Sequence, residues 1–162
     1  MILICLISFL LDGVFSLVVN DNSLFLSLFS LMCLIVIYPY MKCNNHIFYY
    51  SIVIGLFFDI AYTQTLFLNT VIFFLMAILI YYYFKYLPYN IINIILLSLV
   101  TIILFRLVTY VFFVIFEDNI FNMRLLFRSI YTSIISNIVY VLFMNYLCKI
   151  ILKKNASINK VK

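Results

Sequence analysis

The sequence predicts an all-α integral membrane protein with six transmembrane helices, and two observations lead to this fold class. The first is composition: of 162 residues, 69% are hydrophobic and only 9% are charged. Roughly a quarter of the residues of a soluble domain are normally charged, so this chain needs a bilayer as its solvent. The second is spacing, because the apolar residues fall into six stretches, each near the length of about 20 residues that a spanning helix needs.

Short polar breaks separate these stretches. The six apolar stretches cover residues 1–19, 24–41, 47–62, 66–84, 91–116 and 129–152. None alternates apolar and polar residues as barrel strands do, so we expect helices. The third stretch is short and the fifth is long, which predicts a tilt or a break in one of them. We therefore expect a single six-helix transmembrane domain over residues 1–152 and a lysine-rich cytoplasmic tail over residues 153–162.

The basic residues predict the orientation. With both termini in the cytoplasm, the inner side carries seven lysines and the outer loops carry two arginines, and this excess follows the positive-inside rule. The residues are Lys42, Lys85, Lys149, Lys153, Lys154, Lys160 and Lys162 inside, and Arg124 and Arg128 outside. Because the lysines are scattered over loops and the tail, the net charge of +5 predicts orientation and not nucleic-acid binding.

Three ionisable residues lie inside the predicted spans: Asp12, Asp59 and Arg106. Each costs at least about 2.5 kcal/mol at mid-membrane, so each should face protein or water. Counting residues from the inner ends places all three at depths of about 18–24 Å in a core about 30 Å thick. Asn137 falls at a similar level. We hypothesise a polar cluster with Arg106 paired to Asp59 or Asp12, which either only locks the helices together or binds a partner or ligand.

Gly55 stands four residues before Asp59 and shares its helix face. The chain has only two glycines, so this placement favours close helix packing beside the buried acid.

Sequence motifs of membrane enzymes are missing from the chain. The sequence contains no nucleotide-binding loop, zinc-protease motif or serine-nucleophile elbow. Its single histidine and its four cysteines, which form no C-x-x-C pair, indicate neither a metal site nor a catalytic one. We read the cysteines as small hydrophobic residues. We therefore expect a non-enzymatic protein without cofactor, metal or catalytic residues.

Two segments resemble a known family. Residues 55–63 read GLFFDIAYT and are followed by Leu66, Phe67, Leu68 and Asn69; residues 128–137 read RSIYTSIISN. The first resembles the G-x-x-x-D signature of MreD, the bacterial rod shape-determining membrane protein, in its Gram-positive form. The second resembles the start of that family's last helix, although Tyr131 stands where a proline is common. The family-like positions are Gly55, Asp59, Asn69 and Asn137.

The resemblance implies a fold similar to the six-helix substrate-binding subunits of energy-coupling-factor vitamin transporters. It also implies a scaffold in the bacterial plasma membrane that serves cell elongation and controls cell shape. Such proteins bind MreC, a bitopic membrane protein, and through it link MreB filaments to RodA and a class B penicillin-binding protein. Self-association as a homodimer stays open, as do two other functions. One is a substrate-binding subunit of a vitamin-type transporter, and the other is an uncharacterised membrane enzyme.

Overall fold

The chain folds into a helical bundle, seen here in a computed structural model that describes residues 2–19, 27–41, 44–63, 67–116 and 123–158. These residues contain no strand. The helices are α1 (Ile2–Val19), α2 (Phe29–Ile37), α3 (His46–Phe58), α4 (Leu68–Tyr86), α5 (Ile91–Phe116) and α6 (Met123–Ile158). A 3₁₀ turn, η2 (Tyr38–Tyr40), follows α2, and a π-helical turn, η3 (Asp59–Thr63), continues α3.

Four helical segments are long and apolar enough to cross a membrane. They are His46–Thr63, Leu68–Tyr86, Ile91–Phe112 and Leu126–Ile150. Two further apolar helical stretches, Ile2–Phe15 and Phe29–Tyr40, are shorter. This pattern is that of a membrane protein, and the expected all-helical class is confirmed at that level.

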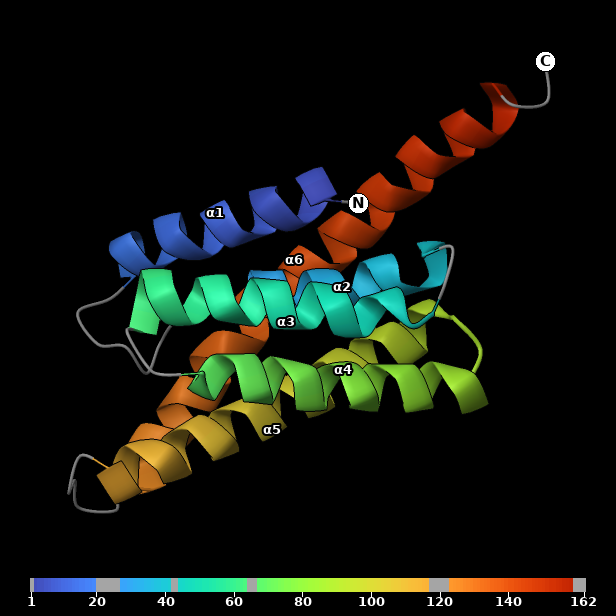
Figure 1. The fold of residues 1–162 in the computed structure, drawn as a ribbon. Coiled ribbons are helices and arrows are strands. Elements are labelled where there is room, and N and C mark those ends of the chain that lie inside the picture. The colour runs from blue at the N-terminus through green and yellow to red at the C-terminus, as the bar shows by residue number, and fades with distance from the viewer. Residues whose placement is uncertain (1, 20–26, 42–43, 64–66, 117–122, 159–162) are drawn as a thin grey trace.

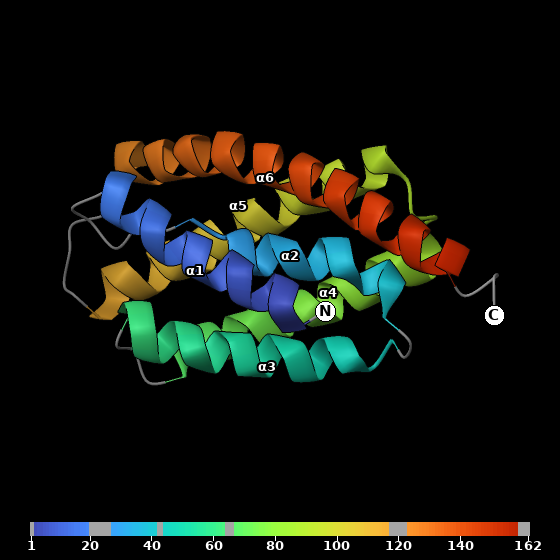
Figure 2. The ribbon, with the colours of Figure 1, turned by 90° about the horizontal axis from the view of Figure 1, so that it is seen from above.

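The short helix α2 forms the centre of the bundle. Every one of its nine residues is buried, and it touches each of the other five helices. A helix that is apolar all round fits such a position, because no face of it needs water. Figure 1 shows α2 behind α3, and Figure 2 shows α1 crossing above it.

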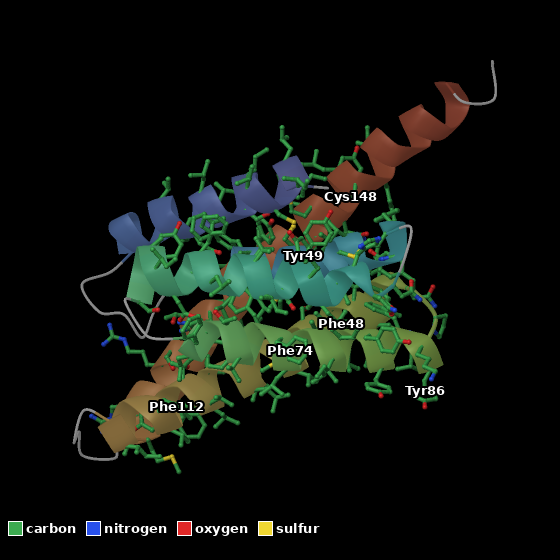
Figure 3. The ribbon with its side chains drawn as sticks, viewed as in Figure 1. Phe48, Tyr49, Phe74, Tyr86, Phe112 and Cys148 are labelled. Atoms are coloured by element: carbon green, nitrogen blue, oxygen red, sulfur yellow. The ribbon has the colours of Figure 1, made fainter. Side chains whose placement is uncertain are left out.

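Helices α3 and α4 form an antiparallel hairpin at one side of the molecule (Figure 1). Phe48 of α3 packs against Phe74 of α4, with ring centroids 5.8 Å apart (Figure 3). At the end of α4, Leu87 leaves the helical conformation immediately before Pro88. A residue that precedes proline is pushed towards extended backbone, which explains why α4 ends there.

Two predicted elements need correction. The stretch 24–41 was expected to be one spanning helix, but α2 begins only at Phe29 and is nine residues long, or about 14 Å. Residues 24–26 lie outside the described part of the chain. Hydropathy could not place the helix start, because the sequence is largely apolar from Leu24 to Ile37. The sixth helix was expected over 129–152, whereas α6 covers Met123–Ile158 and extends beyond the bundle in both views (Figures 1 and 2). The first part of the expected tail is therefore helical.

Candidate functional site: a buried polar network

The start of α2 is capped by an acid from α1. The two oxygens of Asp12 accept hydrogen bonds from consecutive backbone N–H groups, Phe29 at 2.7 Å and Ser30 at 2.8 Å. The hydroxyl of Ser27 donates a third bond at 2.8 Å. The first N–H groups of any helix lack partners within the helix, and a carboxylate also suits the positive end of the helix dipole. The buried acid thus satisfies the start of a buried helix that water does not reach.

Asn137 of α6 also hydrogen-bonds at the start of α2, and through Ser133 it links this helix start to α5. Its amide oxygen accepts a bond from the Leu28 N–H at 3.2 Å, and its amide nitrogen donates to the Ser133 carbonyl at 2.7 Å. The hydroxyl of Ser133 in turn accepts a bond from Nε of Arg106 at 2.8 Å. One continuous network therefore joins α1, α2, α5 and α6.

A second acid, Asp59, caps α4. One of its oxygens accepts bonds from the backbone N–H and the side-chain amide of Asn69, at 2.9 and 3.0 Å. The other accepts bonds from the backbone N–H and the hydroxyl of Thr70, at 2.9 and 2.7 Å. The Asn69 amide also donates to the hydroxyl of Thr63 at 2.8 Å. The π-helical turn that holds Asp59 is thereby fastened to the start of α4.

Gly55 lets the two helices of this hairpin meet. A Cβ atom added at Gly55 would lie 2.6 Å from the Cα of Thr70, which is closer than atoms can approach. The residue at the cap of α4, Phe67, has φ of 59°, a left-handed conformation that is rare for a bulky side chain. The close packing at Gly55 and the bonds to Asp59 thus act on Asn69 and Thr70, which follow this left-handed residue.

The two caps share one design. In each, a buried acid, from α1 in one case and from the turn η3 in the other, uses its two oxygens on two consecutive backbone N–H groups at the start of the helix that follows. Tyr62 connects the two: its hydroxyl donates to the Phe9 carbonyl of α1 at 2.6 Å, and its ring lies against Gly13, next to Asp12.

The opposite end of α2 is also satisfied by a side chain. The hydroxyl of Tyr89, in the loop between α4 and α5, lies 3.3 Å from the Val36 carbonyl and 3.2 Å from the amide oxygen of Asn145. Burial raises the pKa of Tyr89 far above its usual value, so this hydroxyl remains a donor. Both ends of the central helix therefore depend on distant parts of the chain.

The six residues that the sequence singled out all take part in these contacts, but in two groups. Asp12, Asn137 and Arg106 belong to the network around α2, and Gly55, Asp59 and Asn69 to the α3–α4 hairpin. The guanidinium of Arg106 bonds to the hydroxyl of Ser133. The direct pairing of Arg106 with an acid stays a prediction.

Sequence reasoning missed the serines of the network. Ser27 and Ser133 are buried, and their hydroxyls bond to Asp12 and Arg106. The available signal was the spacing of Ser129, Ser133 and Asn137, which stand four residues apart on one face of α6. Within the described parts of the chain, no three His, Cys, Asp or Glu side chains gather closely enough to hold a metal ion. The hydrogen bonds described here join side chains and backbone groups of α1, α2, α5 and α6.

Comparisons with known proteins give no relative. No protein-family model, no curated protein and no solved structure matches this chain.

Proposed function

We propose that this protein is a non-enzymatic membrane scaffold of the MreD type. It would lie in the bacterial plasma membrane with both termini in the cytoplasm and bind a bitopic, MreC-like protein. Through that partner it would couple MreB filaments to the peptidoglycan synthases RodA and a class B penicillin-binding protein, and so control cell shape.

The observation that carries the proposal is that both family-like segments coincide with the polar contacts of the fold. Gly55, Asp59 and Asn69 hold the α3–α4 hairpin, and Asn137 holds the start of α2. A sequence resemblance between apolar helices arises easily by chance. It gains weight when the matched polar residues are those that hydrogen-bond between helices, since membrane helices associate largely through such bonds and close packing.

The distribution of exposed side chains supports recognition through helix faces. Large apolar side chains are exposed along α6, including Tyr131, Ile135, Val139 and Phe143. The same holds along α1, including Leu3, Leu6 and Leu10. In a membrane such rows contact lipid or the transmembrane helix of another protein. A chain whose connections between helices are short has mainly these faces to offer to a partner.

The test is recovery of the partner from gently solubilised membranes with the tagged protein. Wild type is compared with Val139→Trp on α6 and Leu10→Trp on α1, two exposed positions where a bulky ring leaves the interior intact. We expect an MreC-like protein with wild type, and its loss with one of the two variants. Asp59→Asn is the matched interior control: it weakens the cap but leaves both faces unchanged, so the partner should stay.

Other outcomes would contradict the proposal. If the protein is recovered with an ATPase complex or with a bound small molecule, and no bitopic protein, the vitamin-type transporter subunit becomes the better explanation. Loss of the partner with Asp59→Asn alone, in protein that inserts and remains monodisperse, would place recognition at the polar site instead of the helix faces.

A further inference from the structure

Helix α6 is longer than a membrane is thick. Its 36 residues make it about 54 Å long, whereas a bilayer with its headgroups measures about 40–45 Å. The part that is apolar enough to cross the membrane is Leu126–Ile150. The helix continues beyond that part to Ile158 and leaves the bundle there (Figures 1 and 2). This end of α6 therefore lies beyond the hydrocarbon core.

The end of α6 that leaves the bundle is positively charged. Lys149 is exposed, and Lys153 and Lys154 follow it on the same helix. Lys149 and Lys153 stand four residues apart on one face, and like charges at this spacing destabilise a helix. The negative end of the helix dipole supplies only about half an elementary charge. The charge of three lysines is thus larger than the helix itself can offset.

The acids that the structure describes are engaged elsewhere. The carboxylates of Asp12 and Asp59 are buried and bond to the starts of α2 and α4. The sequence has no acid at residues 60–116 or 119–162, so α4, α5 and α6 carry none. Lys85, near the end of α4, is exposed and lies at the same end of the bundle as the lysines of α6 (Figures 1 and 2). The partner that balances this charge should therefore be an anion from outside the chain.

Aromatic and apolar side chains at this end indicate what kind of anion it is. On α6, Tyr146 and Ile150 are exposed on either side of Lys149. On α4, Tyr86 is exposed at the same end, with Lys85 over its ring (Figure 3). Tyrosines favour the headgroup level of a membrane, and lysines near helix ends extend their charge to that level. A water-borne acidic partner would use only the lysines, whereas a lipid layer accommodates all three kinds of side chain.

We propose that the end of α6 binds the headgroups of anionic phospholipids through Lys149, Lys153 and Lys154. The phosphates of lipids such as phosphatidylglycerol supply the negative charge that α6 lacks, and each lysine near an anionic surface adds to the attraction. In the predicted orientation these lipids belong to the inner leaflet. This inference depends on the membrane character of the chain and not on the scaffold function.

The experiment uses a single tryptophan as a reporter of the lipid beside it, because the chain contains no tryptophan of its own. Ile150→Trp places the reporter at an exposed position next to Lys149, and Ile115→Trp on α5 is an exposed reference. Each protein is reconstituted into two bilayers that contain phosphatidylglycerol and phosphatidylcholine in equal amounts. Bromine, which quenches tryptophan fluorescence, is attached to the acyl chains of phosphatidylglycerol in one bilayer and of phosphatidylcholine in the other. Both leaflets have the same composition, so the result does not depend on orientation.

The ratio of quenching in the two bilayers measures the lipid composition around the reporter. At Ile150→Trp we expect about a fivefold excess of phosphatidylglycerol, the factor that one lysine near an anionic surface supplies. At Ile115→Trp we expect no excess, because the nearest charged residue along the chain is Glu117. The excess at Ile150→Trp should fall in about 1 M salt, where the Debye length is only about 3 Å.

The matched variant replaces the three lysines by glutamine in the Ile150→Trp protein, which removes their charge. The excess of phosphatidylglycerol should then fall to the value at Ile115→Trp. Circular dichroism and size-exclusion profiles establish that the variant is folded; if it is not, the salt dependence of the Ile150→Trp protein decides. Equal quenching in the two bilayers at Ile150→Trp would overturn the proposal in favour of an acidic protein segment. An excess that persists without the lysines, or in high salt, would overturn their role.

Discussion

At the scale of single residues, the buried acids work because a carboxylate offers more acceptor sites than any neutral side chain. Each oxygen of Asp59 accepts two of the hydrogen bonds described above, one oxygen from Asn69 and the other from Thr70. An asparagine has one acceptor oxygen, and its amide group would face N–H donors. Leaving a buried donor without a partner costs about 1–3 kcal/mol, so each acid offsets the cost of placing a charge within a membrane span.

The two glycines differ in the atoms that an added Cβ would meet, and this difference predicts the effect of replacing each glycine with alanine. At Gly55 an added Cβ meets the backbone of Thr70, while at Gly13 it meets the hydroxyl end of the Tyr62 ring, at 2.7 Å. We expect Gly55→Ala to destabilise the protein by about 1–3 kcal/mol through overpacking. Gly13→Ala should cost less, because a side-chain end can move and alanine favours a helix by up to about 1 kcal/mol.

The measurement is the midpoint of thermal unfolding in detergent micelles for wild type and both variants. Adding Thr70→Gly to Gly55→Ala should not restore the midpoint, because the added Cβ atom clashes with the backbone of Thr70 and not with its side chain. Equal midpoints for the two variants, or a lower one for Gly13→Ala, would contradict the close approach at Gly55.

At the scale of elements, α2 depends on its neighbours. A nine-residue helix is too short to be stable by itself, because isolated helices need about 12–15 residues even with favourable sequences. Here burial on all sides stabilises it, and side chains from α1, α6 and the loop before α5 satisfy its ends. The helix therefore forms together with the bundle.

Because Asp12 and Asn137 cap the same end of α2, their substitutions should not be additive. We expect Asp12→Ala and Asn137→Ala to show a coupling energy of about 0.5–3 kcal/mol in a double-mutant cycle. The free energy of unfolding in mixed micelles measures it. The matched control pairs Asp12→Ala with Ser51→Ala, whose hydroxyl bonds only to the Phe48 carbonyl of its own helix among the contacts described. That cycle should be additive within about 0.5 kcal/mol, and equal coupling in both cycles would refute a shared cap.

Hydropathy predicted the helices well where a long apolar run ends at a polar break. The fifth stretch, 91–116, matches α5 at both ends, and α1, α3 and α4 lie within two residues of their expected starts. The start of α2 could not be predicted, since it is set by the contacts of Asp12 and Asn137 and not by a change in polarity. The same reasoning explains the site: intramembrane charges stand out in a sequence, whereas the bonds of Ser27 and Ser133 depend on how the helices pack.

At the scale of the whole molecule, the predicted orientation assigns each capped helix start to one half of the bilayer. The predicted orientation places the starts of α2 and α4 in the outer half of the bilayer, where Asp12 and Asp59 satisfy them. Lys85, near the end of α4, lies over the rings of Tyr82 and Tyr86, at 6.0 and 5.9 Å from their centroids. Amphipathic rings with a lysine are typical of a membrane interface, which is the inner one in the predicted orientation.

This arrangement predicts which side of the membrane each connection faces. In a background with all four native cysteines replaced by serine, Asn90→Cys and Arg124→Cys are exposed single-cysteine positions outside the membrane-spanning segments. In intact cells, a membrane-impermeant maleimide should label Arg124→Cys and not Asn90→Cys, because the positive-inside bias places the α4–α5 connection in the cytoplasm. Permeabilised cells should label both, which controls for reactivity. The reverse labelling pattern would contradict the predicted orientation. The ends of α2 and α4 would then lie on the outer side, and their capped starts would lie in the inner half of the membrane.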